Sequence, residues 1–172
     1  MNSFSEIKPT ELKDNPFELI GKEWMLVTAG DKDKNNTMTA SWGAMGILFN
    51  KSVVIIYIRP QRYTFEFLEQ KDEFTLSVLP ESKRDALNIC GKKSGRDCDK
   101  MSEAGIKPLI LESGNVGIEE ARLIIECKKI YGNFFNPESF EDKDKVKSTF
   151  FPNNDYHKVY IAEITKVWTR NK

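Results

Sequence analysis

Short apolar runs separated by polar turns recur along the chain, and most of them are typical of β-strands. Apolar residues alternate with polar ones in residues 74–79, 121–131 and 159–168, which predicts strands with one buried face. Residues 53–58 are nearly all β-branched, so this strand should be buried on both faces. Further strands are expected at residues 24–28, 38–49 and 116–118.

The helices that the pattern predicts are short and lie between the strands. Asn15 and Thr64 are suitable caps for the first two, because their side-chain oxygens can accept hydrogen bonds from a first helical turn. The other two are expected at residues 82–90 and 100–104. Since strands and helices do not alternate regularly, a doubly wound parallel sheet is disfavoured. We expect a mainly β fold, an antiparallel Greek-key β-barrel with short helices.

Length and composition limit the class of protein. The 172 residues suit a single domain, 1–172, with polar residues 136–154 as a surface excursion. Hydrophobic residues make up 40% and charged residues 30%, which is typical of an ordinary globular protein. Lys+Arg and Asp+Glu are 26 each, so the chain lacks the basic excess that nucleic-acid binding requires. We therefore expect no nucleic-acid partner.

Membrane and metal sites are not expected either. No run approaches the roughly 18 apolar residues of a membrane span, and the first residues lack the apolar core of a signal peptide, so a cytoplasmic location is expected. Cys90, Cys98 and Cys127, with His157 as the single histidine, fit no zinc-binding pattern. We expect three free, reduced thiols and no metal ion.

A group of small residues beside a tryptophan interrupts the apolar run at residues 38–49. Thr39, Ala40 and Ser41 would let a flat ring lie against the strand, with its edge bonded to the backbone. Trp42 could then form the wall of a pocket by stacking or edge contact. The alternative is a strand whose small residues make room for a neighbouring helix.

A turn rich in hydrogen-bond donors follows the strand at residues 53–58. Arg59 and Arg62 carry guanidinium groups, which bind phosphate in a bidentate way, and the helix start at Tyr63 and Thr64 adds aligned N–H groups. This combination predicts a phosphate site. The alternative is a solvated turn with surface arginines.

Two other features carry weaker signals. The loop at residues 91–97 combines glycines, cations and a serine, and could bind an anion, although its spacing is not that of a P-loop. A mobile surface loop is the alternative. His157 precedes the last strand, and a lone histidine is more often structural than catalytic. No serine or cysteine triad can be assembled.

Five blocks in order resemble one family. They are MTASWG, RPQRYT, EFTLSVLP, GKKSGRDCDK and DYHKVYIAEI. Each block alone is weak, but the ordered set, from about Trp24 to Trp168, resembles the flavin reductase-like FMN-binding proteins, including the flavoredoxins. The resemblance implies the FMN-binding split barrel, a Greek-key barrel that works as a homodimer with cofactor sites near the subunit interface.

The resemblance also implies a role for each matching residue. The ring and ribityl chain of FMN would contact Thr39, Ala40, Ser41, Trp42, Ser77 and Leu79. The phosphate would be held in the turn that contains Arg59, Arg62, Tyr63 and Thr64. A loop that closes over the flavin, from this subunit or its partner, would contain Lys93, Ser94, Gly95 and Arg96. His157 matches a family position close to the flavin and is the one candidate catalytic residue.

The implied activity is that of an FMN oxidoreductase, which takes hydride from NADH or NADPH and passes electrons to a small-molecule or protein acceptor. Two alternatives remain open from the sequence. One is a flavoredoxin-type electron carrier that a partner protein reduces. The other is a non-enzymatic flavin-binding or sensor module. Fold-level likeness does not choose between them.

Overall fold

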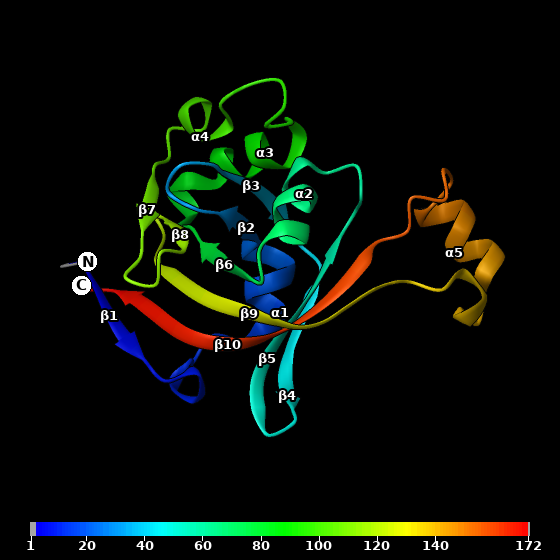
Figure 1. Ribbon diagram of the computed structural model, residues 1–172, viewed down its shortest axis with the longest axis horizontal. Coiled ribbons are helices and arrows are strands. Elements are labelled where there is room, and N and C mark those ends of the chain that lie inside the picture. The colour runs from blue at the N-terminus through cyan, green and yellow to red at the C-terminus, as the bar shows by residue number, and fades with distance from the viewer. Residues whose placement is uncertain (1–2, 172) are drawn as a thin grey trace.

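The computed structural model describes residues 3–171, and most of its regular structure is β. Eight strands form one antiparallel sheet, and two more form a small ribbon (Figure 1). The strands of the sheet are β1 Phe4–Ile7, β2 Met25–Gly30, β3 Asn35–Ala40, β4 Gly43–Leu48, β5 Lys51–Ile58, β6 Glu73–Val78, β9 Leu123–Phe134 and β10 Lys158–Arg170. The ribbon consists of β7 Pro108–Ile110 and β8 Val116–Ile118.

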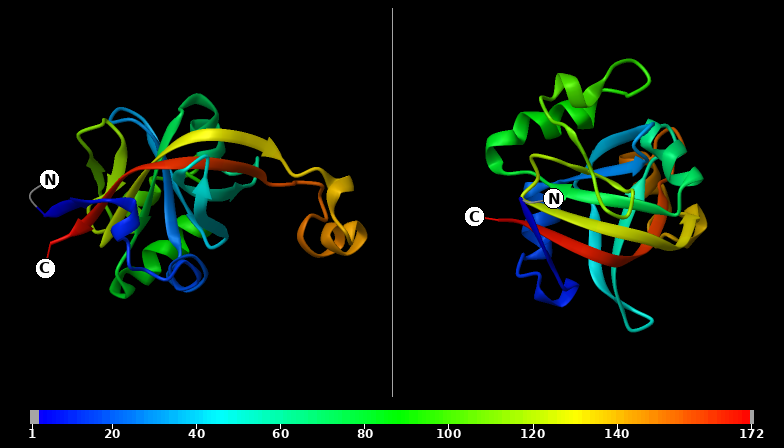
Figure 2. Two further views of the ribbon diagram at one scale, coloured as in Figure 1. Left: turned by 90° about the horizontal axis from the view of Figure 1, so that it is seen from below. Right: turned by 60° about the vertical axis from the view of Figure 1, so that its left-hand side comes forward.

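The order of the strands makes the sheet a Greek-key barrel. Along the sheet the order is β3-β2-β6-β9-β10-β5-β4, and β1 also pairs with β10. The β2–β3 and β4–β5 hairpins thus lie at opposite ends of the sheet, with the long β9–β10 hairpin in the middle. Strong curvature turns the sheet into a barrel (Figure 2). The prediction of a mainly β, antiparallel split barrel is confirmed.

Both faces of the central strands are buried along much of their length, so the expectation of one buried face is wrong for residues 74–78 and 123–127. In β2, Val27 packs inside the barrel and Leu26 packs in a second core outside it. In β9, Ile125 points inward and Ile124 points outward. Alternate side chains of a strand face opposite sides, so two cores need apolar residues at every position.

The helices are short, as predicted. They are α1 Pro16–Glu18, which continues into a π turn at Leu19–Glu23, α2 Tyr63–Gln70, α3 Arg84–Lys92, α4 Lys100–Glu103 and α5 Lys143–Phe150, with 3₁₀ turns at Pro9–Glu11, Glu81–Lys83 and Pro137–Ser139. Helices α3 and α4, together with β7 and β8, cover the outer core beside β2, β3 and β6 (Figure 1).

Two details of the prediction are wrong. The run at residues 38–49 is not one strand: β3 ends at Ala40 and β4 begins at Gly43, where a Cβ would lie 2.8 Å from the Ile55 carbonyl oxygen. The chain crosses between the two ends of the sheet there. Thr64 does not cap α2; Arg62 holds the N-cap position, and the buried Thr64 hydroxyl accepts a hydrogen bond of 2.6 Å from Asn36.

Three elements were not predicted. Strand β1 has one buried residue, Phe4, which is too short a pattern to recognise, and it pairs with the last residues of β10. Strand β7 has three residues, of which two are exposed. Helix α5 lies within the polar residues 136–154. The chain between β9 and β10 forms an arm, residues 135–157, which carries α5 away from the barrel (Figures 1 and 2).

Within residues 3–171 no helix is long and apolar enough to cross a membrane. In the same range no cluster of His, Cys, Asp and Glu is arranged to hold a metal ion, and all three cysteines are free thiols.

A buried carboxylate ties the ribbon to the sheet. Glu126 of β9 is 1% exposed. Its Oε1 accepts a hydrogen bond of 2.8 Å from Trp168 Nε1, and its Oε2 accepts bonds from the Asn115 amide at 2.8 Å and from the Ser113 hydroxyl. Three donors from β10 and from the β7–β8 turn therefore depend on one acceptor.

Replacing Glu126 with Ala should lower the free energy of unfolding by about 3 kcal/mol, because buried donors would lose their acceptor. Glu126→Gln keeps one oxygen and should lose about 1 kcal/mol. Urea denaturation measures both, with the exposed Glu119→Ala as the matched control. A loss below about 0.5 kcal/mol for Glu126→Ala, the usual range of surface changes, would contradict this role.

Candidate functional site

A cleft of about 220 Å³ opens where the chain passes from β3 to β4. It brings together many of the residues that the sequence singled out, from β3, the following corner, the end of β5 and the start of β10. Its lining consists of Met38, Thr39, Ala40, Ser41, Trp42, Tyr57, Arg59, Arg62 and His157.

Small residues form one side of this cleft. The Thr39 hydroxyl donates a hydrogen bond of 2.5 Å to the Leu87 carbonyl of α3, so its side chain is turned toward the helix. Ala40 is buried. The Trp42 ring is half exposed and lies 5.5 Å from the ring of His157. The resulting surface suits a flat group with Trp42 at one edge.

Arg62 projects from the start of α2 toward the end of α3. Its guanidinium donates hydrogen bonds of 2.7 Å to the Gly91 carbonyl and 3.0 Å to the Cys90 carbonyl. Burial lowers the pKa of Arg62 from its ordinary value.

Lys100, the first residue of α4, is a buried cation close enough to Arg62 to feel its charge, and it lines a neighbouring pocket of about 720 Å³ instead of the cleft itself. It is 4% exposed, and its ammonium donates to the Thr37 carbonyl of β3. Burial, and then the charge of Arg62, lower the pKa of Lys100 to about 8. Lys100 was not among the predicted site residues, although it closes the GKKSGRDCDK block.

These two cations lack a counter-charge. Within residues 3–171 neither Arg62 nor Lys100 forms an ion pair with a carboxylate, and both donate only to backbone carbonyls. Buried charges are normally paired, since an isolated one costs several kcal/mol. A bound anion would provide the missing charge, and phosphate is the one whose geometry suits a guanidinium.

The predicted closing loop contacts the start of α2 within the same chain. A Cβ on Gly95 would lie 2.0 Å from Asn36 Oδ1, so only glycine allows this approach. Arg96 lies 4.8 Å over the ring of Tyr63 and pairs with Glu66. The Ser94 hydroxyl accepts a 3.2 Å bond from the Arg96 amide.

Lys93 points elsewhere, to an ion pair with Glu103 of α4. The loop thus places Gly95 and Arg96, but not the Lys93 ammonium, beside the helix that carries Arg62.

Arg59 has a different task from Arg62. Its guanidinium donates a 2.5 Å hydrogen bond to Asp155 and a 2.9 Å bond to the Phe150 carbonyl, both on the arm. Gln61 donates a 2.8 Å bond to the same carboxylate. These bonds, that of Gln61 foremost, lower the pKa of Asp155. Arg59 therefore fastens the arm to the barrel instead of pointing freely toward a phosphate.

His157 lies between these groups and is 7% exposed. Burial, and then the charge of Arg59, lower its pKa to about 4, so the imidazole is neutral at neutral pH. Its Nδ1 is buried and lacks a hydrogen-bond partner among the described residues. An unpaired buried nitrogen is costly, and a polar group of a ligand in the cleft would satisfy it.

The side chains of Ser77 and Leu79 do not line the cleft. Both are buried beside β6: Ser77 stands opposite Leu26 and Ile124, and Leu79 packs in the outer core. The resemblance implied that both residues contact the flavin, but strand β2 separates β6 from β3, which lines the cleft.

The cleft therefore combines three properties: a flat wall of small residues, the half-buried Arg62 without a carboxylate partner among residues 3–171, and a neutral histidine with an unpaired nitrogen. The buried Lys100 lies in the neighbouring pocket. A flat, phosphorylated cofactor such as FMN fits this set of groups. The sequence analysis did not single out Met38 and Tyr57, which line the cleft, nor Lys100 and Asp155. Their roles depend on burial or on contacts across the fold, for which local sequence gives no signal.

Similar solved structures share the fold at low sequence identity. A Shewanella baltica protein, an FMN-binding domain of a flavin reductase-like enzyme, has a TM-score of 0.70 at 16% identity, covering 97% of this chain and 77% of that one. A flavoredoxin of Desulfovibrio vulgaris has a TM-score of 0.66 at 19% identity, covering 96% and 77%. A Streptomyces globisporus NADH:FAD oxidoreductase has a TM-score of 0.62 at 18% identity, covering 87% and 75%.

No curated protein sequence matches the chain. The family is shown by a model of the flavin reductase like domain, which matches residues 18–172. This match spans most of the chain and includes every residue of the cleft. The chain belongs to the flavin reductase-like domain family.

Proposed function

We propose that this protein is an FMN-dependent oxidoreductase that takes hydride from NADH or NADPH and passes electrons to a small-molecule or protein acceptor. The observation that carries the proposal is a pair of cations without a carboxylate partner among residues 3–171, the half-buried Arg62 in the cleft and the buried Lys100 in the neighbouring pocket, beside a wall suited to a flat ring. The similar structures support it, since one is an FMN-binding domain and another is an NADH:FAD oxidoreductase.

Different residues would hold different parts of the cofactor. Arg62 and Lys100 would bind the phosphate, and the backbone of Thr39, Ala40 and Ser41 would face the ring. FMN, when bound, would supply the hydride and electron chemistry. His157, neutral above about pH 4, would exchange a hydrogen bond with the ring or the nicotinamide without adding a charge.

A second candidate function is a flavoredoxin-type electron carrier that a partner protein reduces. The likeness to the Desulfovibrio vulgaris flavoredoxin favours it. Both functions use the same site, and they differ in the source of the electrons.

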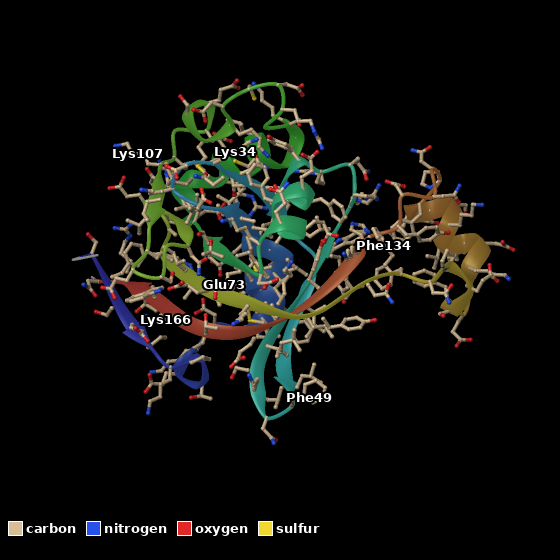
Figure 3. The ribbon with its side chains drawn as sticks, in the orientation of Figure 1. Lys34, Phe49, Glu73, Lys107, Phe134 and Lys166 are labelled. Atoms are coloured by element: carbon tan, nitrogen blue, oxygen red, sulfur yellow. The ribbon has the colours of Figure 1, made fainter. Side chains whose placement is uncertain are left out.

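We also propose that the protein works as a homodimer. Ile47 and Phe49 expose 70% and 74% of their surfaces, and Phe49 projects from the tip of the β4–β5 hairpin (Figure 3). Large apolar side chains exposed together on one hairpin are typical of an interface. A second copy of the chain would cover them.

Anaerobic mixing of the FMN-loaded protein with NADH or NADPH tests the proposed function. At least one nucleotide should bleach the flavin absorbance within seconds, a rate useful for turnover. If dithionite bleaches the flavin but neither nucleotide does, the electron-carrier function is the correct one. A protein that binds no FMN would overturn both.

Removing the second cation should weaken FMN but not riboflavin. Lys100→Met keeps the length of the side chain and deletes its charge, so the dissociation constant for FMN should rise about 10- to 100-fold, the equivalent of one charged hydrogen bond. Riboflavin lacks the phosphate and should change less than about 3-fold. Lys92→Met, an exposed lysine at the end of α3, is the matched control. Equal losses for both ligands would contradict the phosphate role.

The same lysine predicts a pH dependence. In the free protein the pKa of Lys100 is about 8, so the ammonium loses its proton as the pH rises past that value. FMN affinity should therefore fall between about pH 8 and pH 10, and Lys100→Met should abolish the fall. Titration of FMN fluorescence measures both, and an unchanged wild-type affinity across this range would contradict the prediction.

The dimer is tested by light scattering. The wild type should have twice the mass of the chain, and replacing both Ile47 and Phe49 with Ser should shift the equilibrium toward the monomer by removing buried apolar area. A wild-type protein that is monomeric at micromolar concentration would overturn the proposal.

A further inference from the structure

A second pocket, much larger than the cleft, lies on the other side of Trp42. Its volume is about 630 Å³, within the usual range for small-molecule sites. The barrel provides one wall, through β4, β5 and the segment of α1, and the arm provides the other. The cleft and this pocket share Ser41, Trp42 and Tyr57, so the two spaces are next to one another.

The lining of this pocket carries no charged side chain. Its fifteen residues are apolar or neutral, and nearly half are aromatic. The charged groups nearby, Arg59 and Asp155, bond to one another, and neither lines the pocket. An anion that entered would lose water without gaining a cation, which costs several kcal/mol.

The aromatic wall is held in place by contacts on the arm and across to the barrel. Phe135 stacks on Tyr57 with ring centres 5.5 Å apart, and Phe140 lies 5.4 Å from Phe135. Phe150 meets Trp42 edge-on at 5.8 Å. Arg59 adds a bond to the Phe150 carbonyl, which anchors the arm at this point. The pocket is thus preformed, with flat rings on several sides.

We propose that this pocket binds the electron acceptor, and that the acceptor is an uncharged cyclic compound of the quinone class. Flat apolar rings are what an uncharged aromatic wall recognises best, through burial and offset stacking. The shared residues Trp42 and Tyr57 place such a ring directly beside the cleft. The inference rests on the proposed oxidoreductase function and adds the identity of the acceptor class.

The net reaction between the nicotinamide and the quinone is balanced in atoms and electrons. The C–H bond of NADH or NADPH breaks and leaves the oxidised nicotinamide. Its hydride supplies two electrons and one proton equivalent, and solvent supplies one further proton. The two carbonyl groups of the quinone become the two hydroxyl groups of the hydroquinone.

Two related acceptors, 1,4-naphthoquinone and 1,4-naphthoquinone-2-sulfonate, test whether the pocket prefers an uncharged ring to an anion. The sulfonate is the stronger oxidant, so driving force alone would favour it. With the FMN-loaded protein and NADH, we expect the uncharged quinone to have a KM at least 10-fold lower. A KM for the sulfonate that is equal or lower would overturn the inference.

A matched pair of variants on α5 tests the location. Val146 lines the pocket, whereas Ser148 is exposed on the same helix. Val146→Lys should raise the KM for naphthoquinone at least 10-fold. Ser148→Lys adds the same charge outside the pocket and should leave this KM unchanged. If the two variants behave alike, the acceptor binds elsewhere.

Equilibrium dialysis without NADH separates this inference from the proposed function. Oxidised, FMN-loaded protein should retain naphthoquinone, and Val146→Lys should retain at least 10-fold less. This binding can be measured even if NADH and NADPH fail to reduce the flavin. That failure would reject the proposed reductase function and leave the inference about the pocket intact. If flavin is reduced normally but naphthoquinone does not bind, for example because a second copy of the chain fills the pocket, the inference alone is rejected.

Discussion

The site depends on one electrostatic constraint: the half-buried Arg62 and the buried Lys100 have no carboxylate partner among residues 3–171. Arg62 holds the last carbonyls of α3, and Lys100 holds a carbonyl of β3, so these two side chains join α2, α3, α4 and β3 at one point. Backbone carbonyls offset only part of the cost of two buried charges. The arrangement is favourable when an anion completes it, which couples the local stability of this corner to the binding of a phosphate.

Arg59 and Arg62, three residues apart, make different contacts because their surroundings differ. Arg62 turns inward to α3, whereas Arg59 reaches outward to Asp155 and the Phe150 carbonyl. The second contact fastens the arm, and the arm forms one wall of the apolar pocket. The turn that begins α2 thus organises both spaces: one arginine helps to create the charged cleft, and the other positions the uncharged wall beside it.

Much of this could be predicted from the sequence. Period-two patterning identified β6, β9 and β10, and the ordered blocks brought Thr39–Trp42, Arg62 and His157 together correctly. The errors share a physical cause. The corner at Ser41 and Trp42 exists because β3 and β4 pair with different strands of the sheet. The role of Lys100 depends on its burial, and that of Arg59 depends on its contact with Asp155, more than ninety residues away. Local sequence carries no signal for such long-range choices.

Trp42 lies at the boundary between two opposite environments, and this separation bears on specificity. Phosphate binding requires charges on one side of it, whereas an uncharged ring on the other side requires that no charge be present. Ion pairing of Arg59 with Asp155 meets both needs, since it neutralises the cation closest to the pocket while leaving Arg62 and Lys100 unpaired. Acceptor choice would then depend on the wall formed by the arm. A change of residues in that wall would alter the acceptor with little effect on the cofactor site, because His157 is the one residue of the arm among those that line the cleft.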